Sequence, residues 1–391
     1  MADKVNMLKK ITLLLILFTM TVGATSTFSY NSVHTAGKYS LPRDSITIKV
    51  AILDSAIPSF TSPPEMEEIL DGYSWACRNN TYEFEVKFIS DLQISSGALK
   101  NYDVLIIPGI GKEFRRVNSE LSQWKKEIRD FVAGGGGYFG TCGGANMASE
   151  GLLSAKERGW EKDTAWEWFM NRSAIGIAPV KSYQDMGDPM ACSLADNPAR
   201  IGQSAYVWYN LSIEGSGVCQ HCRVNTDHPI FKGYGKDTRI IRWVGGPALI
   251  PDGNVTVLAW YPDENISGPN GNRSTGVHVW KYGADFSEPL DLWDMENNTI
   301  ETHLAGKPAA VACSYGEGRV VIFGNHPEHP VWSSGQIFEE DTDSNHMLSK
   351  GLFGWKDRQP LPDSYNWWIV RRSAAWAAGL PSDVLPPVGD L

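Results

Sequence analysis

The residue of this sequence with the clearest chemical potential is a cysteine on a glycine-flanked turn. Cys142 lies in Gly140-Thr141-Cys142-Gly143-Gly144, directly after the apolar pair Tyr138-Phe139. A thiol between a strand and a helix lies close to a helix N-terminus, where backbone N–H groups and the helix dipole favour the thiolate. Cys142 is therefore a candidate nucleophile. The alternative is a small buried apolar residue, because free cysteine is among the most buried residue types.

A second segment offers the partners that such a nucleophile needs. His326-Pro327-Glu328 follows the strand-like run Val320-Val321-Ile322-Phe323. His326 can hold or take the thiol proton, and Glu328 lies two residues on, on the same side of an extended segment, where it can fix the imidazole tautomer. We predict a triad of Cys142, His326 and Glu328, with His329 as a neighbour rather than the base.

The elements around these residues predict an α/β fold. Apolar strand-like runs alternate with amphipathic segments, which is typical of a parallel sheet with helices on both faces. The expected strands are 46–53, 82–89, 104–107 and 138–139, and the expected helices are about 65–77, 119–132 and one that starts near Gly143. We expect a flavodoxin-like, doubly wound, mostly parallel sheet.

The third strand ends at Pro108-Gly109-Ile110-Gly111, a turn whose glycines allow backbone N–H groups to face a ligand. Ligands of such sheets bind at the carboxyl ends of strands, so this turn and Cys142 are expected in one crevice. Asp54 and Glu65, near the end of the first strand, are either substrate contacts or, as favoured here, solvated surface residues.

The rest of the chain is less regular. Residues 151–305, rich in Trp, Gly, Asn and Asp, predict a large β-rich and loop-rich insertion that shapes the pocket rather than supplying the chemistry. A β-hairpin over 309–323 then leads to His326, and a closing helix is expected over 366–379. Residues 45–380 form the folded domain, and 381–391 form a loose C-terminal tail.

The N-terminus predicts export. Residues 1–24 combine three lysines, an apolar run from Ile11 and a small-residue exit, which is typical of a signal peptide. The protein is expected to be secreted or at the cell surface, with an uncleaved membrane anchor as the alternative.

The formal charge of −10 disfavours nucleic acid as a partner. Asn-x-Ser/Thr sequons, consistent with glycosylation, occur at Asn79, Asn171, Asn210, Asn254, Asn265, Asn272 and Asn297.

Two further sets of residues have competing interpretations. Cys219 and Cys222 form a Cys-x-x-Cys pair, for which a local disulfide or buried thiols are favoured over a metal site. The tryptophans of the middle region either line a sugar or peptide groove or, as favoured here, pack in the core. They are Trp166, Trp168, Trp208, Trp243, Trp260 and Trp280.

Three motifs in order resemble class I glutamine amidotransferase domains: the 106–111 segment, the Cys142 turn and Phe323-Gly324-Asn325-His326-Pro327-Glu328. The resemblance implies that Cys142 is on a nucleophile elbow. It also implies an oxyanion hole from backbone N–H groups of Gly143 and of Ile110 or Gly111, with Gly109 beside the substrate.

The segments 243–247, 257–261 and 310–320 are similar to the amidotransferase-like domain at the N-terminus of eukaryotic biotin–protein ligases. Amidotransferases usually carry Gln four residues after the nucleophile to bind glutamine, where this chain has Asn146, so Asn146 is the candidate substrate-binding residue at this position. No synthase domain is expected to receive ammonia, so a true glutamine amidotransferase is disfavoured.

We therefore expect a cysteine-dependent hydrolase that acts on a small-molecule amide or a peptide, without a metal, other cofactor or synthase partner. The alternative is a glycosylated surface protein that binds a ligand on the same scaffold without turnover.

Overall fold

The computed structural model describes residues 44–54, 62–109, 123–154, 171–183, 204–205, 218–243, 246–263, 277–282, 293–300, 304–340, 352–360 and 365–389. The predicted signal peptide lies outside the described residues, as do Ile110 and Gly111 of the predicted oxyanion hole.

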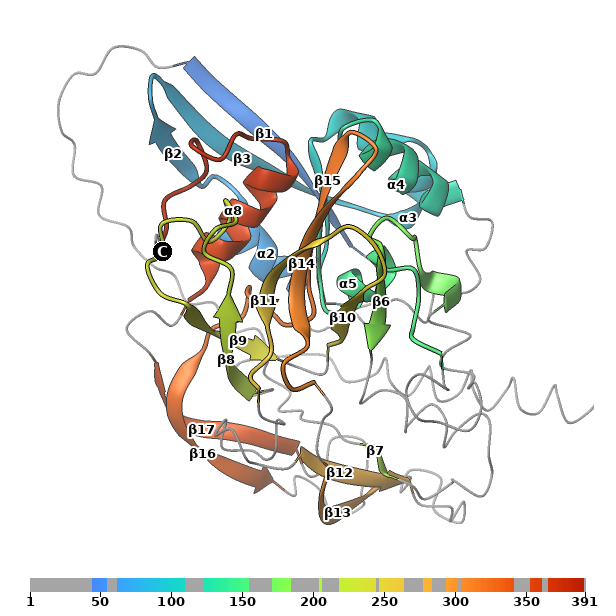
Figure 1. The fold of residues 1–391 in the computed structure, drawn as a ribbon, viewed down its shortest axis with the longest axis vertical. Helices are drawn as coiled ribbons and strands as arrows, with labels where there is room; N and C mark the ends of the chain where they lie inside the picture. Colours follow the sequence, from blue (N-terminus) through green and yellow to red (C-terminus); the bar gives the residue numbers. More distant parts are fainter. Residues whose placement is uncertain are drawn as a thin grey trace, which may run out of the picture.

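The centre of the molecule is a ten-stranded mixed sheet (Figure 1). Its strands, in order across the sheet, are β2 (Ser74–Cys77), β3 (Asn80–Ile89), β1 (Asp44–Leu53), β4 (Val104–Ile107), β5 (Gly137–Thr141), β15 (Gly318–Phe323), β14 (Pro308–Tyr315), β11 (Thr256–Trp260), β8 (Val218–Val224) and β9 (Thr238–Trp243). The run from β3 to β15 is parallel. Strand β2 and the four strands beyond β15 pair antiparallel. The predicted α/β class, the parallel strands and the 309–323 hairpin are confirmed.

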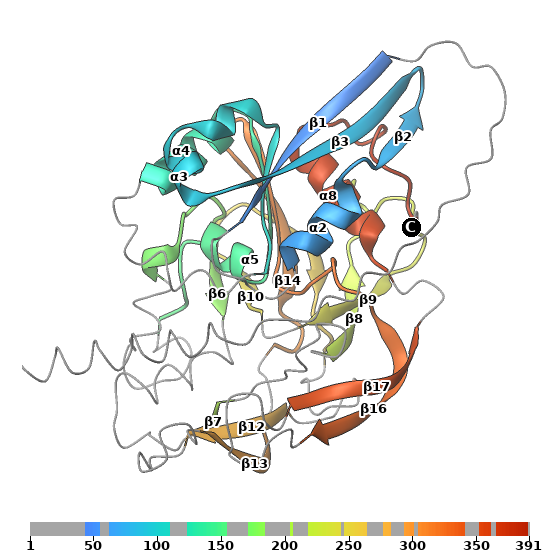
Figure 2. The ribbon, with the colours of Figure 1, turned by 180° about the vertical axis from the view of Figure 1, so that it is seen from behind.

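Helices cover both faces of the parallel strands, as a doubly wound fold requires (Figures 1 and 2). On one face α2 (Ser62–Leu70) and α8 (Trp367–Ala377) pack against one set of strand residues. On the other face α3 (Asp91–Ser95), α4 (Gln123–Ala133) and α5 (Gly143–Ala148) pack against the alternate set, and the short 3-10 helix η1 (Ala98–Asn101) lies beside them. The strands are buried on both sides, which explains their continuous apolar runs.

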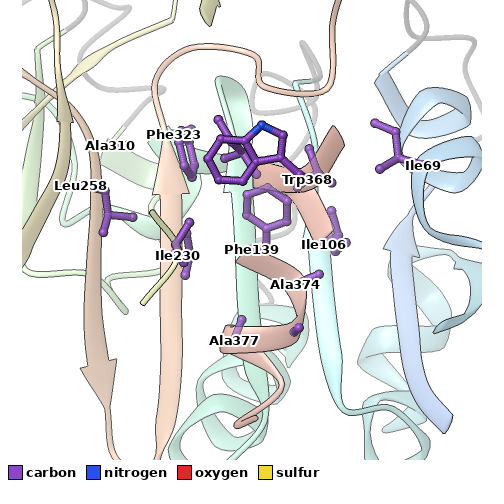
Figure 3. Packing of buried hydrophobic residues seen from close by; sticks show 14 of the residues in the cluster. Ile69, Ile106, Phe139, Ile230, Leu258, Ala310, Phe323, Trp368, Ala374 and Ala377 are labelled. Atoms are coloured by element: carbon purple, nitrogen blue, oxygen red, sulfur yellow. The ribbon is translucent and has the colours of Figure 1, made fainter. Parts of the chain in front are cut away.

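Helix α8 packs very closely on the middle of the sheet. Figure 3 shows Trp368 near Phe139, with the small residues Ala374 and Ala377 further along the same helix. The approach is so close that a Cβ on Gly137 would overlap the carbonyl of Ala377. Small residues on both elements therefore bring the closing helix, which was predicted over 366–379, against β5.

The predicted helix over 65–77 is wrong in its second half. Helix α2 ends at Leu70, a turn follows in which Gly72 has φ +70°, and Ser74–Cys77 form the edge strand β2. The alternating burial of β2 places Trp75 inward, where its ring stacks on Tyr82 at a centroid distance of 5.3 Å. Pairing with β3 buries this large aromatic surface, which overrides the helical pattern of the sequence.

The 151–305 segment contributes strands to the main sheet, because β8, β9 and β11 all come from it. It also provides β6 (Val180–Tyr183), which pairs with β10 (Ala248–Pro251), and a small sheet of β7 (Ser204–Ala205), β12 (Val277–Tyr282) and β13 (Trp293–Ile300). Strands β16 (Trp332–Glu340) and β17 (Leu352–Pro360) form a separate pair. Among the described residues, no helix is long and apolar enough to cross a membrane.

The predicted loose tail is not loose over its first residues. Val384 and Leu385 are buried in the core of the α8 face. The Trp75 indole N–H donates to the Val384 carbonyl over 2.8 Å, and the Arg372 guanidinium donates to the Pro386 carbonyl. Apolar burial and these hydrogen bonds attach the tail to β2 and α8.

Candidate active site

Cys142 occupies a sharp turn between β5 and α5. Its backbone has φ +49° and ψ −106°, a conformation that residues with a side chain rarely adopt. Neighbouring glycines permit the turn: a Cβ on Gly144 would overlap the Ile107 carbonyl, and one on Gly140 would lie 2.8 Å from the Gly144 backbone. The Cys142 N–H donates to the Phe323 carbonyl over 2.8 Å. This is the geometry of a nucleophile elbow, with a partly exposed thiol at its tip.

His326 connects Cys142 to Glu328. The Nδ1 atom of His326 lies 2.8 Å from Oε1 of Glu328, and Cys142 is close enough to the same imidazole to raise its pKa. The side chains of His326 and Glu328 are 6% and 0% exposed. The structure therefore brings together the three residues that the sequence singled out.

Charge interactions dominate the ionisation of this buried pair. Burial alone would lower the pKa of His326, but the charges of Glu328 and Cys142 outweigh it and raise that pKa to about 10. Burial alone would raise the pKa of Glu328, but His326 outweighs it and lowers that pKa. An imidazolium and a carboxylate are therefore the favoured forms at neutral pH.

Gly109 lies against both His326 and Cys142, as expected for a turn at the same edge of the sheet as Cys142. A Cβ on Gly109 would overlap the His326 imidazole and lie 3.3 Å from Cβ of Cys142. The Gly109 N–H donates to Oγ1 of Thr141 over 3.0 Å, so this amide is engaged within the protein. Any residue with a side chain at position 109 would collide with the His326 imidazole.

The remaining predicted residues lie on α5. Gly143 is at the first helical position, where the N–H has no acceptor within the helix and can face a ligand. The backbone N–H of Asn146 donates to the Cys142 carbonyl over 3.1 Å, and the Asn146 side chain is only 2% exposed. Asn146 thus packs beneath the elbow.

His329 lies beside the predicted triad, as expected from the sequence, and its contact with Glu65 was not foreseen. The ring of His329 stacks on His326 at a centroid distance of 4.6 Å and an interplanar angle of 10°. Its Nδ1 lies 2.5 Å from Oε2 of Glu65 on α2, so the interpretation of Glu65 as a solvated surface residue is wrong. Burial, together with His326 and Arg242, lowers the pKa of His329 well below its ordinary value. A neutral imidazole therefore covers the face of the charged one.

The 151–305 segment also holds the base in place. The backbone N–H of His326 donates to the Arg242 carbonyl of β9 over 2.7 Å, and the Asn325 amide donates to Sγ of Cys222 on β8. The segment was expected only to shape the pocket, but these bonds hold His326 and Asn325 in place. Nothing in the sequence indicated that β8 and β9 would bind these two residues.

The loop after β9 lies against the elbow. A Cβ on Gly246 would overlap the Gly324 carbonyl and lie 3.4 Å from Cα of Cys142. The Trp243 indole N–H donates to the Gly246 carbonyl, and the Tyr261 hydroxyl donates to the Pro247 carbonyl, each over 2.8 Å. Gly246 thus forms one wall of the site.

The Cys-x-x-Cys pair consists of free thiols. Cys219 and Cys222 are both buried and, three residues apart on β8, they lie on opposite faces of the strand. Burial raises the pKa of Cys222 to about 12 and that of Cys313 to about 12. A local disulfide is therefore excluded, and the buried-thiol alternative is confirmed for this pair.

One group of metal-ligand types occurs among the described residues: His326, Glu328 and His329, with ligand atoms within 4.8 Å of one another. Each imidazole Nδ1 already pairs with a carboxylate, of Glu328 or of Glu65. These contacts with carboxylates account for the positions of both imidazoles.

The tryptophan groove has no support in the described residues. Trp243 is fully buried in the core, and Trp260 is covered by the Arg223 guanidinium at 4.2 Å from its ring. Trp166, Trp168 and Trp208 lie outside the described residues, as does the side chain of Trp280.

No protein-family model matches the chain. No curated protein matches it. Among solved structures, a glutamine amidotransferase is similar over 71% of this chain and 90% of its own, with 15% identity and a TM-score of 0.35. A glutamine amidotransferase from Thermotoga maritima is similar over 72% and 77%, with 10% identity and a TM-score of 0.32. A cytoplasmic protein from Salmonella typhimurium is similar over 71% and 86%, with 13% identity and a TM-score of 0.31.

Proposed function

We propose that this protein is an exported, cysteine-dependent hydrolase that cleaves an amide or peptide bond with Cys142, His326 and Glu328. The observation that supports this most is the buried imidazole of His326, which pairs with Glu328 through Nδ1 and lies beside Cys142. An activated thiol next to an oriented imidazole is the arrangement required for acyl transfer.

In the proposed reaction the Cys142 thiolate attacks the substrate carbonyl carbon and forms a C–S bond. Backbone N–H groups of Gly143 and of Ile110 or Gly111 stabilise the oxyanion. His326 donates its proton to the leaving nitrogen as the C–N bond breaks. Water then attacks the thioester while His326 takes a proton from it, and cleavage of the C–S bond releases the acid and restores the thiolate beside the imidazolium. Glu328 holds His326 throughout.

The other thiols of the chain serve as internal references for a test of this proposal. Cys222 and Cys313 are buried, and burial raises the pKa of each to about 12, whereas Cys142 is partly exposed beside a charged imidazole. A soft alkylating probe on the intact protein, read by peptide-resolved mass spectrometry, should label Cys142 first at neutral pH. His326→Ala should slow that labelling about 100-fold, within the range that general-base assistance contributes.

A screen of glutamine, small amides and short peptides should then find turnover that Cys142→Ala abolishes while the fold is retained. Cys77→Ala, which removes another partly exposed thiol, is the matched control and should remain active. Retained turnover in Cys142→Ala would reject the assignment. Ordinary thiol reactivity at Cys142, unchanged in His326→Ala, would also reject it and favour a ligand-binding protein on the same scaffold.

Export and glycosylation are part of the proposal and rest on the N-terminal segment and the sequons. Of the sequons, Asn79, Asn171 and Asn254 have described side chains, and all three are exposed, which glycosylation requires. Expression in a eukaryotic secretory host should give a mature chain that starts after about residue 24 and loses mass on treatment with an amidase that removes N-linked glycans. An intact N-terminus in the cell fraction would contradict export.

A further inference from the structure

Thr141, the residue before the nucleophile, makes contacts that the proposed reaction does not use. It is the last residue of β5 and is fully buried. Its hydroxyl oxygen lies 2.9 Å from Oε1 of Glu328 and 3.0 Å from the Gly109 nitrogen. A hydroxyl has one proton to donate and two lone pairs, so it can donate to the carboxylate and accept from the amide at the same time.

The Glu328 oxygen that accepts from Thr141 also contacts His326. Oε1 of Glu328 accepts from the Thr141 hydroxyl and also lies 2.8 Å from Nδ1 of His326. Gly109 in turn has no room for a side chain beside the His326 imidazole. The loop after β4, the hydroxyl, the carboxylate and the imidazole therefore form a closed ring of contacts around Cys142.

We infer that Thr141 is a positioning residue whose hydroxyl couples the Gly109 loop to Glu328 and so sets the loop and the base together. The role of this coupling in turnover rests on the proposed function, but the contacts themselves do not. The inference concerns the hydroxyl and not the bulk of the side chain, because Thr141 is enclosed and a valine would fill the same space.

Two substitutions separate the effect of the Thr141 hydroxyl from the effect of its side-chain volume. Thr141→Val keeps the shape and removes both hydrogen bonds, whereas Thr141→Ser keeps the hydroxyl and removes a methyl group. In hydrogen exchange, the Gly109 amide should exchange about tenfold faster in Thr141→Val, because its buried N–H loses its acceptor, and at the wild-type rate in Thr141→Ser. If the valine variant does not fold, Thr141→Ala provides the same loss of the hydroxyl.

A second readout follows from the carboxylate. Loss of the donated hydrogen bond disfavours the charged form of Glu328, so its pKa should rise towards the ordinary value in Thr141→Val. A carboxyl with a lowered pKa in the folded state contributes stability that is lost as the pH falls through that pKa. The acid unfolding midpoint should therefore move to higher pH in Thr141→Val and stay in place in Thr141→Ser. A purely steric role would not move it in this pattern.

Unchanged Gly109 exchange and an unchanged acid midpoint in Thr141→Val would overturn the inference. Equal effects of the valine and serine variants would also overturn it, because volume would then be responsible. Failure of the proposed function is a separate result, since ordinary reactivity of Cys142 in the wild-type protein would reject the hydrolase while the exchange measurement still decides the role of Thr141.

Discussion

The two halves of the large sheet position the site in different ways. In the parallel half, Cys142 is placed by glycines within a few residues of it, which allow the turn between β5 and α5. In the antiparallel half, His326 is placed by the Arg242 carbonyl of β9, and the preceding Asn325 is held by Cys222 of β8. The position of Cys142 thus depends on steric fit with nearby residues, and that of His326 depends on pairing between distant strands. A substitution in one half should therefore disturb the Cys142 turn, whereas one in the other half should displace His326.

The largest effect is expected where the halves meet most tightly, at Gly109. Gly109→Ala places a Cβ into the space of the His326 imidazole, which Glu328 holds from the other side. A displacement of about 1 Å at a reacting group can cost about 100-fold in rate, so Cys142 alkylation should slow by that order. Peptide-resolved alkylation kinetics at neutral pH measure it.

Gly235→Ala is the control for lost stability, because Gly235 has φ +76° and lies away from the site. It should lower the unfolding free energy by about 1 kcal/mol and leave alkylation unchanged. Equal slowing in the two variants would show that the effect of Gly109→Ala is global.

The charge on the base gives the second test. A histidine with a raised pKa contributes stability that is complete below its unfolded pKa and is lost as the pH rises through the folded value. For His326 this window runs from 6.5 to about 10. The difference in unfolding free energy between the wild type and His326→Gln should therefore shrink as the pH rises through this window.

His228 provides the matched control for that measurement. Burial lowers its pKa to about 4, so its contribution to stability is complete above 6.5 and is lost only as the pH falls. His228→Gln should leave the alkaline profile unchanged. A His326→Gln difference that stays constant from pH 6.5 to about 10 would contradict the charged imidazole.

A matched pair of buried tyrosines compares the halves directly. The Tyr138 hydroxyl of β5 donates to the Gly144 carbonyl over 2.7 Å, and that of Tyr261 donates to the Pro247 carbonyl over 2.8 Å. Each Tyr→Phe change leaves a buried carbonyl without this donor and should cost about 1–2 kcal/mol in denaturant unfolding. Tyr138→Phe should also slow Cys142 alkylation more than Tyr261→Phe, because Gly144 belongs to the elbow. If Tyr261→Phe slowed the alkylation more, the Pro247 segment that Tyr261 holds would control the reactivity of Cys142 instead.

The smallest effect is expected at the second imidazole. Glu65→Ala removes the carboxylate beside His329, whose stacked ring covers His326. Loss of this buried polar contact should slow Cys142 alkylation about threefold. Glu68→Ala, an exposed residue on the same helix, should have no effect. Equal rates in all three proteins would remove His329 from the support of the base.

The elbow and the parallel strands were predictable because their signals are local. Continuous apolar runs, amphipathic helices and a glycine-flanked cysteine depend on residues within one or two turns of each other. The arrival of β4, β5 and β15 at one edge follows from the parallel pairing, so Gly109, Cys142 and His326 were expected to meet.

The antiparallel half was less accessible to prediction. Residues 151–305 were expected to be β-rich, but nothing in them indicated that β9 would bind His326. Residues 74–77 likewise had a helical pattern, and only pairing with β3 and stacking of Trp75 on Tyr82 made them a strand. In each case a distant partner decided the outcome.

The sequence by itself determined the α/β class, the turn that exposes Cys142 and the short spacing that pairs His326 with Glu328, because each of these depends on neighbours along the chain. Only the tertiary structure decided that Thr141 bridges Gly109 and Glu328, that Glu65 reaches His329, and that β8 and β9 hold the base. The physical reason is that hydrogen bonds and burial act between atoms that are close in space, and which distant segments become neighbours is fixed only when the sheet and its helices pack together.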